Sequence, residues 1–222
     1  MGVPSKATGV GSNEDPGARP HRRHRPPLVE QALAQGHHVT ALARNPAKLH
    51  SRCADLTVVQ GDVTDPLAVE RAVRSQDAVL CALGSSTPLK HDAALVAGIG
   101  NLVGAMERLH VRRLVYLSFL GVHHGRRQLS RLGKYVVAPL LMRKVAADHE
   151  HKEAIIQRST LDWVIVRPPR LTNGRRTGTY RSGEDIWATL VVPRVSRADL
   201  AEFMLRQLNG DTYVRRTPAV MY

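Results

Sequence analysis

The sequence predicts an α/β domain built on a doubly wound parallel sheet. Strand-like and helix-like segments alternate from Val39 to Val166, and the strands at 77–84 and 112–122 are nearly continuous apolar runs. Such alternation is typical of parallel strands joined by right-handed helical crossovers. Continuous apolar strands are expected where helices cover both faces of the sheet.

The composition limits what the chain can be. Its 222 residues, 43% of them hydrophobic, suit one domain with a small lobe. Two cysteines are too few for a disulfide framework and indicate reduced thiols in a cytoplasmic protein. The chain has no apolar run of membrane-spanning length, no secretory h-region and no spacing of metal ligands. We therefore expect neither a membrane partner nor a metal site.

The net charge of +13 raises the question of nucleic-acid binding. The segment 108–144 contains no acidic residue, but no nucleic-acid motif accompanies it and only 4% of all residues are aromatic. We therefore interpret the charge as solvated basic faces and expect no nucleic-acid partner. The nine basic residues of this segment are Arg108, Arg112, Arg113, Arg126, Arg127, Arg131, Lys134, Arg143 and Lys144.

The elements follow in a regular order. An apolar stripe predicts a first helix from Leu28, ending near Gly36, and Asn45 and Pro46 suit the start of a short helix after the strand at 37–44. Ser196 is the predicted N-cap of a late helix. The other predicted strands lie in 56–65, 77–84, 112–122 and 162–171, the other helices in 65–76, 93–111, 148–161 and 196–209, and a small lobe occupies roughly 170–222.

Residues 1–27 do not fit this order. They are rich in Gly, Pro, Ser, Arg and His, so we expect a disordered or aberrant segment. A dinucleotide-binding sheet begins with an apolar strand that enters a glycine-rich turn and then the first helix. "ATGVGS" at 7–12 resembles such a turn, but no apolar strand precedes it and it lies far from Leu28. We predict that the first strand and the glycine-rich loop are missing or replaced.

A shifted reading frame is one hypothesis for this segment. Arginine, histidine and proline are what a Thr-Gly-Arg-rich stretch of GC-rich codons gives out of frame, and the proper frame would resume near Leu28. The DNA upstream, read in all three frames, tests this hypothesis.

Two strand ends carry candidate contacts to the adenosine half of a dinucleotide. Arg44 closes the second strand, where an acidic residue accepts the 2′-hydroxyl of NAD and an arginine pairs with the 2′-phosphate of NADP. The alternative for Arg44 is a solvated surface arginine. Asp62 follows the next strand, where it either reaches the adenine or caps a turn.

The next two strands end on small or polar residues. Ser118 points from the strand at 112–122 toward the expected nicotinamide position, although a serine there could also cap a turn. The strand before it ends on Ala82, Leu83 and Gly84, which permit either close cofactor approach or tight packing.

Several motifs occur together and in order. They are "ALARNPAKL", "VVQGDVTD", "QDAVLCALG", "NLVGAMERLHVRRLVYLS", "LDWVIVRPPRLTNGRRTGTY" and "DLAEFMLRQL". Over roughly 30–222 the chain resembles the atypical short-chain dehydrogenases/reductases with an NAD(P)H-binding, NmrA-like domain, and is most similar to the biliverdin-IXβ reductase/flavin reductase branch. The resemblance implies a Rossmann-like fold, NADP(H) favoured over NAD(H), and a small conjugated acceptor such as a flavin, quinone or tetrapyrrole.

The resemblance also implies roles for individual residues. Ser118 matches the active-site serine, His149 matches a histidine of the reductase branch imperfectly, and Lys152 matches a helix lysine of the wider group. These positions make Ser118 and His149 the candidate catalytic residues. The implied cofactor contacts are Arg44, Asp62, Val63, Ala82, Leu83, Gly84, Ser118, Lys152, Pro168, Pro169 and Arg170.

One departure from typical short-chain dehydrogenases affects the chemistry. Their Tyr-x-x-x-Lys pair is absent, because Tyr135 is followed four residues later by Pro139. The proton of a reduction would come from water or His149, since hydride transfer is mainly the chemistry of the cofactor. Three functions follow: an NADPH-dependent oxidoreductase, a non-enzymatic NADP-binding redox-sensing regulator, or the inactive product of a frameshifted gene.

Overall fold

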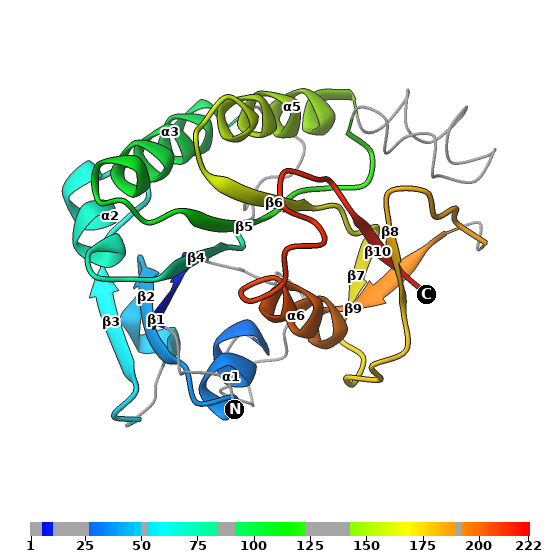
Figure 1. The fold of residues 1–222 in the computed structure, drawn as a ribbon, viewed down its shortest axis with the longest axis horizontal. Helices are drawn as coiled ribbons and strands as arrows, with labels where there is room; N and C mark the ends of the chain where they lie inside the picture. The colour runs from blue at the N-terminus through cyan, green and yellow to red at the C-terminus, as the bar shows by residue number, and fades with distance from the viewer. Residues whose placement is uncertain (1–5, 11–26, 50–52, 84–91, 123–142, 190–191) are drawn as a thin grey trace.

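The computed structural model describes residues 6–10, 27–49, 53–83, 92–122, 143–189 and 192–222. These residues form a six-stranded sheet between two layers of helices (Figure 1). All five strand pairings are parallel and their order is β3-β2-β1-β4-β5-β6, so the predicted doubly wound parallel sheet is confirmed. The strands are β1 (Lys6–Val10), β2 (His38–Ala43), β3 (Leu56–Gln60), β4 (Ala78–Cys81), β5 (Arg113–Leu117) and β6 (Asp162–Val166).

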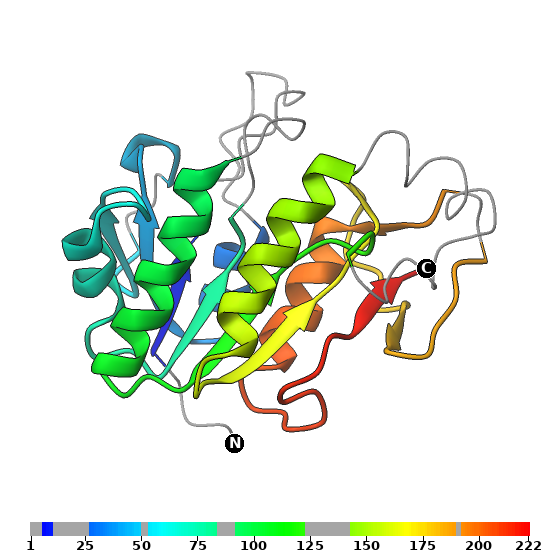
Figure 2. The ribbon, with the colours of Figure 1, turned by 90° about the horizontal axis from the view of Figure 1, so that it is seen from above.

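Helices cover both faces of this sheet (Figures 1 and 2). One face carries α2 (Pro66–Val73), α3 (Ala93–Arg108) and α5 (Arg143–Gln157). The opposite face carries α1 (Pro27–Ala34) and α6 (Arg197–Arg206), and the short 3-10 helix η1 (Pro46–Leu49) follows β2.

The apolar strand sequences explain why two helical layers are needed. In β5, Leu114 and Tyr116 pack toward α2, α3 and α5, whereas Val115 and Leu117 pack toward α1 and α6. Strands β4 and β6 divide their side chains in the same alternating way. Successive side chains of a strand point to opposite faces, so a strand that is apolar throughout must be buried on both sides.

Local signals set the helix ends where the sequence predicts them. Ser196 caps α6 by accepting a hydrogen bond from Asp199 N, and Asn45 Oδ1 accepts one from Ala47 N at the start of η1. Gly36 follows α1 with φ of +81°, a left-handed conformation that costs glycine little.

The prediction that the first strand is missing is wrong. Lys6–Val10 forms β1, which pairs in parallel with β2 on one side and β4 on the other. The short sequence KATGV lacks the apolar run of a buried strand, which is why the sequence pattern does not reveal it. The segment becomes a strand because β2 and β4 each present unpaired backbone N–H and C=O groups to the space between them. Pairing with these groups does not require large side chains. The predicted position of the glycine-rich loop, after β1, lies outside the described residues.

The chain after β6 adds two small sheets and one covering helix. Strand β7 (Arg170–Thr172) pairs in parallel with β9 (Arg194–Ser196), and β8 (Arg181–Gly183) pairs antiparallel with β10 (Ala219–Met221). Helix α6 packs beside α1 over the main sheet. Residues 170–222 therefore build part of the sandwich as well as a lobe near the carboxyl end of β6.

A buried carboxylate joins the parts of this C-terminal region. Asp199 accepts hydrogen bonds from Thr177 N, Gly178 N and the hydroxyl of Tyr222. Burial alone would raise the pKa of Asp199, but these hydrogen bonds outweigh it and lower the pKa to about 2. The carboxylate thus fixes the loop after β7 and the C-terminal tyrosine to the start of α6.

The position of β1 makes a prediction about stability. Thr8→Pro removes a backbone N–H from a strand that pairs on both sides and leaves a ladder partner unsatisfied, so it should lower the free energy of unfolding by roughly 1 to 3 kcal/mol. Thr8→Val retains the backbone N–H and serves as the control. Urea denaturation measures both; equal midpoints for Thr8→Pro and Thr8→Val would contradict the central place of β1.

Candidate functional site

The carboxyl ends of the parallel strands gather most of the predicted site residues at one edge of the sheet. Arg44 follows β2, Asp62 follows β3, Ala82 and Leu83 follow β4, and Ser118 follows β5. Strands β1 and β4 are neighbours, although the chain runs from β1 to β2 and β3 on one side and from β4 to β5 and β6 on the other. Ligands of doubly wound sheets bind beyond the carboxyl ends at such a change of direction.

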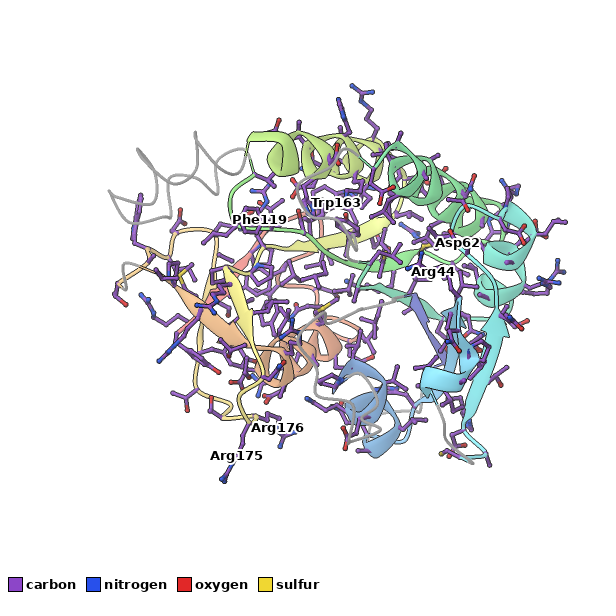
Figure 3. All side chains as sticks on the ribbon, turned by 180° about the vertical axis from the view of Figure 1, so that it is seen from behind. Arg44, Asp62, Phe119, Trp163, Arg175 and Arg176 are labelled. Carbon is purple, nitrogen blue, oxygen red and sulfur yellow. The ribbon has the colours of Figure 1, made fainter. Side chains whose placement is uncertain are left out.

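Arg44 and Asp62 form the first part of the site. Their side chains point toward one another in Figure 3, and Arg44 Nε lies 3.8 Å from Asp62 Oδ2. Both side chains are partly exposed, at 51% and 38%. Asp62 Oδ1 accepts hydrogen bonds from the N and Oγ1 of Thr64, and the backbone bond is the main reason that the pKa of Asp62 is lowered. This arrangement presents a guanidinium to solvent beside a carboxylate that is already held in place.

Close packing against α3 fixes the loop after Asp62. Asn101 Nδ2 donates to the carbonyl oxygens of Val63 and Thr64, at 3.2 and 3.3 Å. A Cβ atom at Gly98 would lie 2.5 Å from Val63 Cγ1, so only glycine allows this approach. Val63 therefore directs its buried side chain into the core, and only its backbone is left for a ligand at this edge.

A buried network forms the second part of the site, at the ends of β5 and β6. Ser118 Oγ donates to Glu153 Oε1 at 2.5 Å. The same carboxylate pairs with Arg167, which directs Nε to Oε1 at 3.1 Å and Nη2 to Oε2 at 2.5 Å. The side chains of Glu153 and Arg167 are 0% and 5% exposed. Ser118 is thus held by an ion pair that water does not reach.

His149 of α5 lies beside this network. Its Nδ1 is 3.5 Å from Ser118 Oγ, and its ring is 6.3 Å from that of Phe119. Burial, helped by the cation of Lys152 and opposed by Asp148, lowers the pKa of His149 to about 4. The imidazole is therefore neutral near pH 7 and carries one ring proton.

Lys152 is buried one turn farther along α5. Burial lowers the pKa of Lys152, while Asp148, Cys81 and Asp92 oppose that shift. Asp148 also accepts a hydrogen bond from Asp92 N, which joins α5 to the start of α3. Burial raises the pKa of Cys81 to about 12, so this thiol stays protonated at the end of β4.

The segment 168–170 divides between two environments. Pro168 and Pro169 are buried, and Pro168 O accepts a hydrogen bond from Leu120 N, which places this turn next to the residues after Ser118. Arg170 is exposed on β7 and lies in register with Arg194 of β9, which is also exposed. Gly84, the remaining predicted contact, lies outside the described residues.

Sequence reasoning missed Glu153 and Arg167. Both were hidden because charged residues are usually interpreted as solvated. A signal was present in "DWVIVRPP", where an arginine directly follows a strand that is apolar on both faces. Such an arginine requires a buried acid, and a helix that packs against β5 and β6 is where that acid would be found.

The comparison with protein families gives the identity of the domain. The family model described as NAD(P)H-binding matches residues 27–211. The chain belongs to this NAD(P)H-binding family.

Among curated proteins, it is 24% identical over 207 residues to the photosystem II assembly factor Ycf39 of Synechocystis, covering 87% of this chain and 58% of that protein. It is 27% identical over 200 residues to (4-alkanoyl-5-oxo-2,5-dihydrofuran-3-yl)methyl phosphate reductase of Streptomyces griseus, covering 86% and 62%. The chain thus spans about three fifths of the length of these two relatives.

Solved structures confirm the fold. A short-chain dehydrogenase/reductase of Veillonella parvula in complex with NADP superposes with a TM-score of 0.76 at 17% identity, covering 97% of this chain and 94% of that one. The anaerobillin reductase ChuY of Escherichia coli O157:H7 gives a TM-score of 0.74 at 19% identity, with coverages of 97% and 96%. These likenesses confirm the Rossmann-like fold that the resemblance implies, and the family model independently supports its NAD(P)H-binding character.

The described residues show neither a metal-binding cluster nor a membrane-spanning helix. They contain no group of three or more His, Cys, Asp or Glu side chains suited to a metal ion. None of their helices has the length and apolar character needed to cross a bilayer.

The lowered pKa of His149 predicts a pH dependence of stability. The unfolded chain takes up the proton near pH 6.5, but the folded chain does so only near pH 4, so stability should fall as the pH decreases through this interval. His149→Gln should remove this part of the slope, whereas His151→Gln, at an exposed position of the same helix, serves as the control. Urea denaturation between about pH 7 and pH 4 measures the slopes. Equal slopes for the two variants would show that His149 is not held neutral by the fold.

Proposed function

We propose that the chain is an NADPH-dependent oxidoreductase that transfers hydride to a small conjugated acceptor of the flavin, quinone or tetrapyrrole type. The observation that carries this proposal is the arrangement along the carboxyl edge of the sheet. Arg44, which is partly exposed, follows β2. Ser118 follows β5, farther along the same edge, and lies beside the neutral His149 of α5. This order matches the adenosine and nicotinamide ends of a dinucleotide that lies across the sheet.

The residues at the end of β2 fit the 2′-phosphate of NADP. The Arg44 side chain is about half exposed, so its guanidinium can donate two parallel hydrogen bonds to a phosphate. Asp62 lies 3.8 Å from Arg44 Nε, and its other oxygen is occupied by Thr64, so it orients the arginine without enclosing it. An acid at the position of Arg44 would favour NAD instead.

The chain's own residues set the conditions at the nicotinamide end. When bound, NADPH would supply the hydride. Ser118, backed by the buried ion pair, would orient the reacting partners, and Pro168 and Pro169 would line the same pocket. Because the pKa of His149 is about 4, the histidine is not an imidazolium donor near pH 7, and the proton would come from water.

Relatives support a reductase of small molecules. A solved structural neighbour binds NADP, another is an anaerobillin reductase, and the Streptomyces relative reduces a phosphate-bearing substrate. Different acceptors on one framework are expected, since binding residues are carried disproportionately by loops on a shared scaffold.

Paired arginines favour an acceptor with an anionic group. Arg170 and Arg194 occupy matching positions on the parallel strands β7 and β9, so their side chains leave the same face of this small sheet. Both are exposed, and among the described residues neither has an acidic partner. Like charges on neighbouring strands are unfavourable unless an anion lies between them. We therefore propose that they hold a phosphate or carboxylate of the acceptor.

Cofactor preference tests the role of Arg44. Arg44→Asp should weaken NADPH binding by roughly 10- to 100-fold, because a charged hydrogen bond is lost and a like charge faces the phosphate, and should affect NADH much less. Arg158→Asp makes the same charge change near the C-terminus of α5, at the opposite edge of the sheet, and is the control. Isothermal titration with both cofactors measures this, and equal losses for NADPH and NADH would contradict the assignment.

Turnover with two matched flavins tests the proposed activity and its acceptor together. Steady NADPH oxidation with FMN and riboflavin, which differ by one phosphate, should show kcat/KM for FMN higher by roughly 10-fold. Arg170→Met and Arg194→Met should reduce this ratio toward one. Arg158→Met is the control. Tight NADPH binding without turnover of flavins, quinones or tetrapyrroles would instead indicate the redox-sensing regulator.

A further inference from the structure

The contacts of Ser118 determine how its hydroxyl can be used. A serine hydroxyl has one proton to donate and two lone pairs that accept. A carboxylate paired with an arginine can only accept, and Glu153 Oε1 lies 2.5 Å from Ser118 Oγ. The single proton of Ser118 is therefore directed to Glu153. Toward every other neighbour, Ser118 offers only lone pairs.

Arg167 keeps this arrangement in place. Its guanidinium contacts both oxygens of Glu153, so the carboxylate cannot rotate away from Ser118 without breaking an ion pair. The side chains of Glu153 and Arg167 are buried, so breaking their contact would leave a desolvated charge without its partner. The backbone also fixes Ser118, because its N–H donates to Val166 O, next to Arg167.

The same logic extends to His149. Its Nδ1 faces Ser118 Oγ at 3.5 Å, and a hydroxyl that has already given its proton to Glu153 can bond this nitrogen only by accepting. The ring proton of the neutral histidine therefore belongs on Nδ1, which leaves Nε2 with a lone pair. The charged neighbours of His149 on its own helix are Lys152 and Asp148, and Asp148 Oδ2 accepts a hydrogen bond from Asp92 N at the start of α3.

We propose that Glu153, held by Arg167, is a positioning residue that makes Ser118 a hydrogen-bond acceptor and fixes the Nδ1–H tautomer of His149. The inference rests on the proposed function in one respect: a ligand group that meets Ser118 in the reductase site must be a donor, such as an amide or ring N–H. The arrangement of Ser118, His149 and Glu153 itself requires no ligand.

The tautomer of His149 can be measured without a cofactor. In the full chain labelled with ¹⁵N-histidine, the resonances of His149 are assigned by their loss in His149→Gln. We expect a pyrrole-type signal for Nδ1 and a pyridine-type signal for Nε2 near pH 7. The reverse pattern in the unsubstituted chain would overturn the proposal directly, with no variant needed.

A paired substitution tests the role of Glu153. Glu153→Leu together with Arg167→Met replaces the buried ion pair by apolar side chains, which avoids leaving one charge unpaired. The proton of Ser118 is then free to turn toward His149, so the ring proton should move to Nε2. Glu70→Leu with Arg74→Met removes a surface ion pair of α2 and is the matched control, for which the His149 signals should not change.

Ser118→Ala shows whether the effect passes through the serine. It should abolish the preference for Nδ1–H, and adding the paired substitution to Ser118→Ala should cause no further shift. A tautomer that stays the same in Ser118→Ala, or that shifts equally with and without Ser118, would overturn the proposal. Because these spectra are recorded without NADPH, absence of turnover would refute the proposed function and leave the tautomer result intact.

Discussion

Parallel pairing of six strands is the constraint on which the rest of the molecule depends. Because every strand of the main sheet runs in the same direction, residues that follow five different strands meet at one edge. Both helical layers are consequences of the same pairing, since strands buried on both faces require covering on both faces. Strand β1 completes the arrangement: without it, β2 and β4 would present two unpaired edges in the middle of the sheet.

The two halves of the site use charge in opposite ways. At the end of β2, Arg44 and Asp62 stay partly exposed, and water and salt screen their interaction at 3.8 Å. At the ends of β5 and β6, Glu153 and Arg167 are removed from water, so their attraction is strong but their desolvation is costly. A buried ion pair of this kind contributes little net stability and is better understood as a device that fixes geometry. Through the hydrogen bond from Ser118 Oγ to Glu153 Oε1, this ion pair also fixes the orientation of the serine hydroxyl.

The sequence predicted the fold class because its strands and helices obey simple periodicities. It also predicted that Arg44, Asp62 and Ser118 lie at strand ends, since Arg44 and Ser118 directly follow recognisable strands and Asp62 comes two residues after one. It did not predict β1, because the segment KATGV has no strand pattern of its own. This segment becomes a strand by pairing with β2 and β4, which are distant in sequence. Glu153 and Arg167 were missed for a related reason. The pairing of two charged side chains 14 positions apart becomes visible only when α5 is packed against β6.

The contacts of the arginines show that part of the positive charge serves the fold and is not simply solvated. Several arginines of the basic segment are engaged with acids that lie far away in the sequence, such as Arg112 with Asp162 and Arg113 with Asp211. These pairs tie the amino ends of β5 and β6 to each other and to the segment after α6, and so belong to the fold. Arg170 and Arg194 differ, because they share a register position and neither is paired with an acid within the part of the chain that the structure describes. Net charge therefore says little about binding here, whereas the like charges on adjacent strands near the end of β6 are the basis of the proposed anion site.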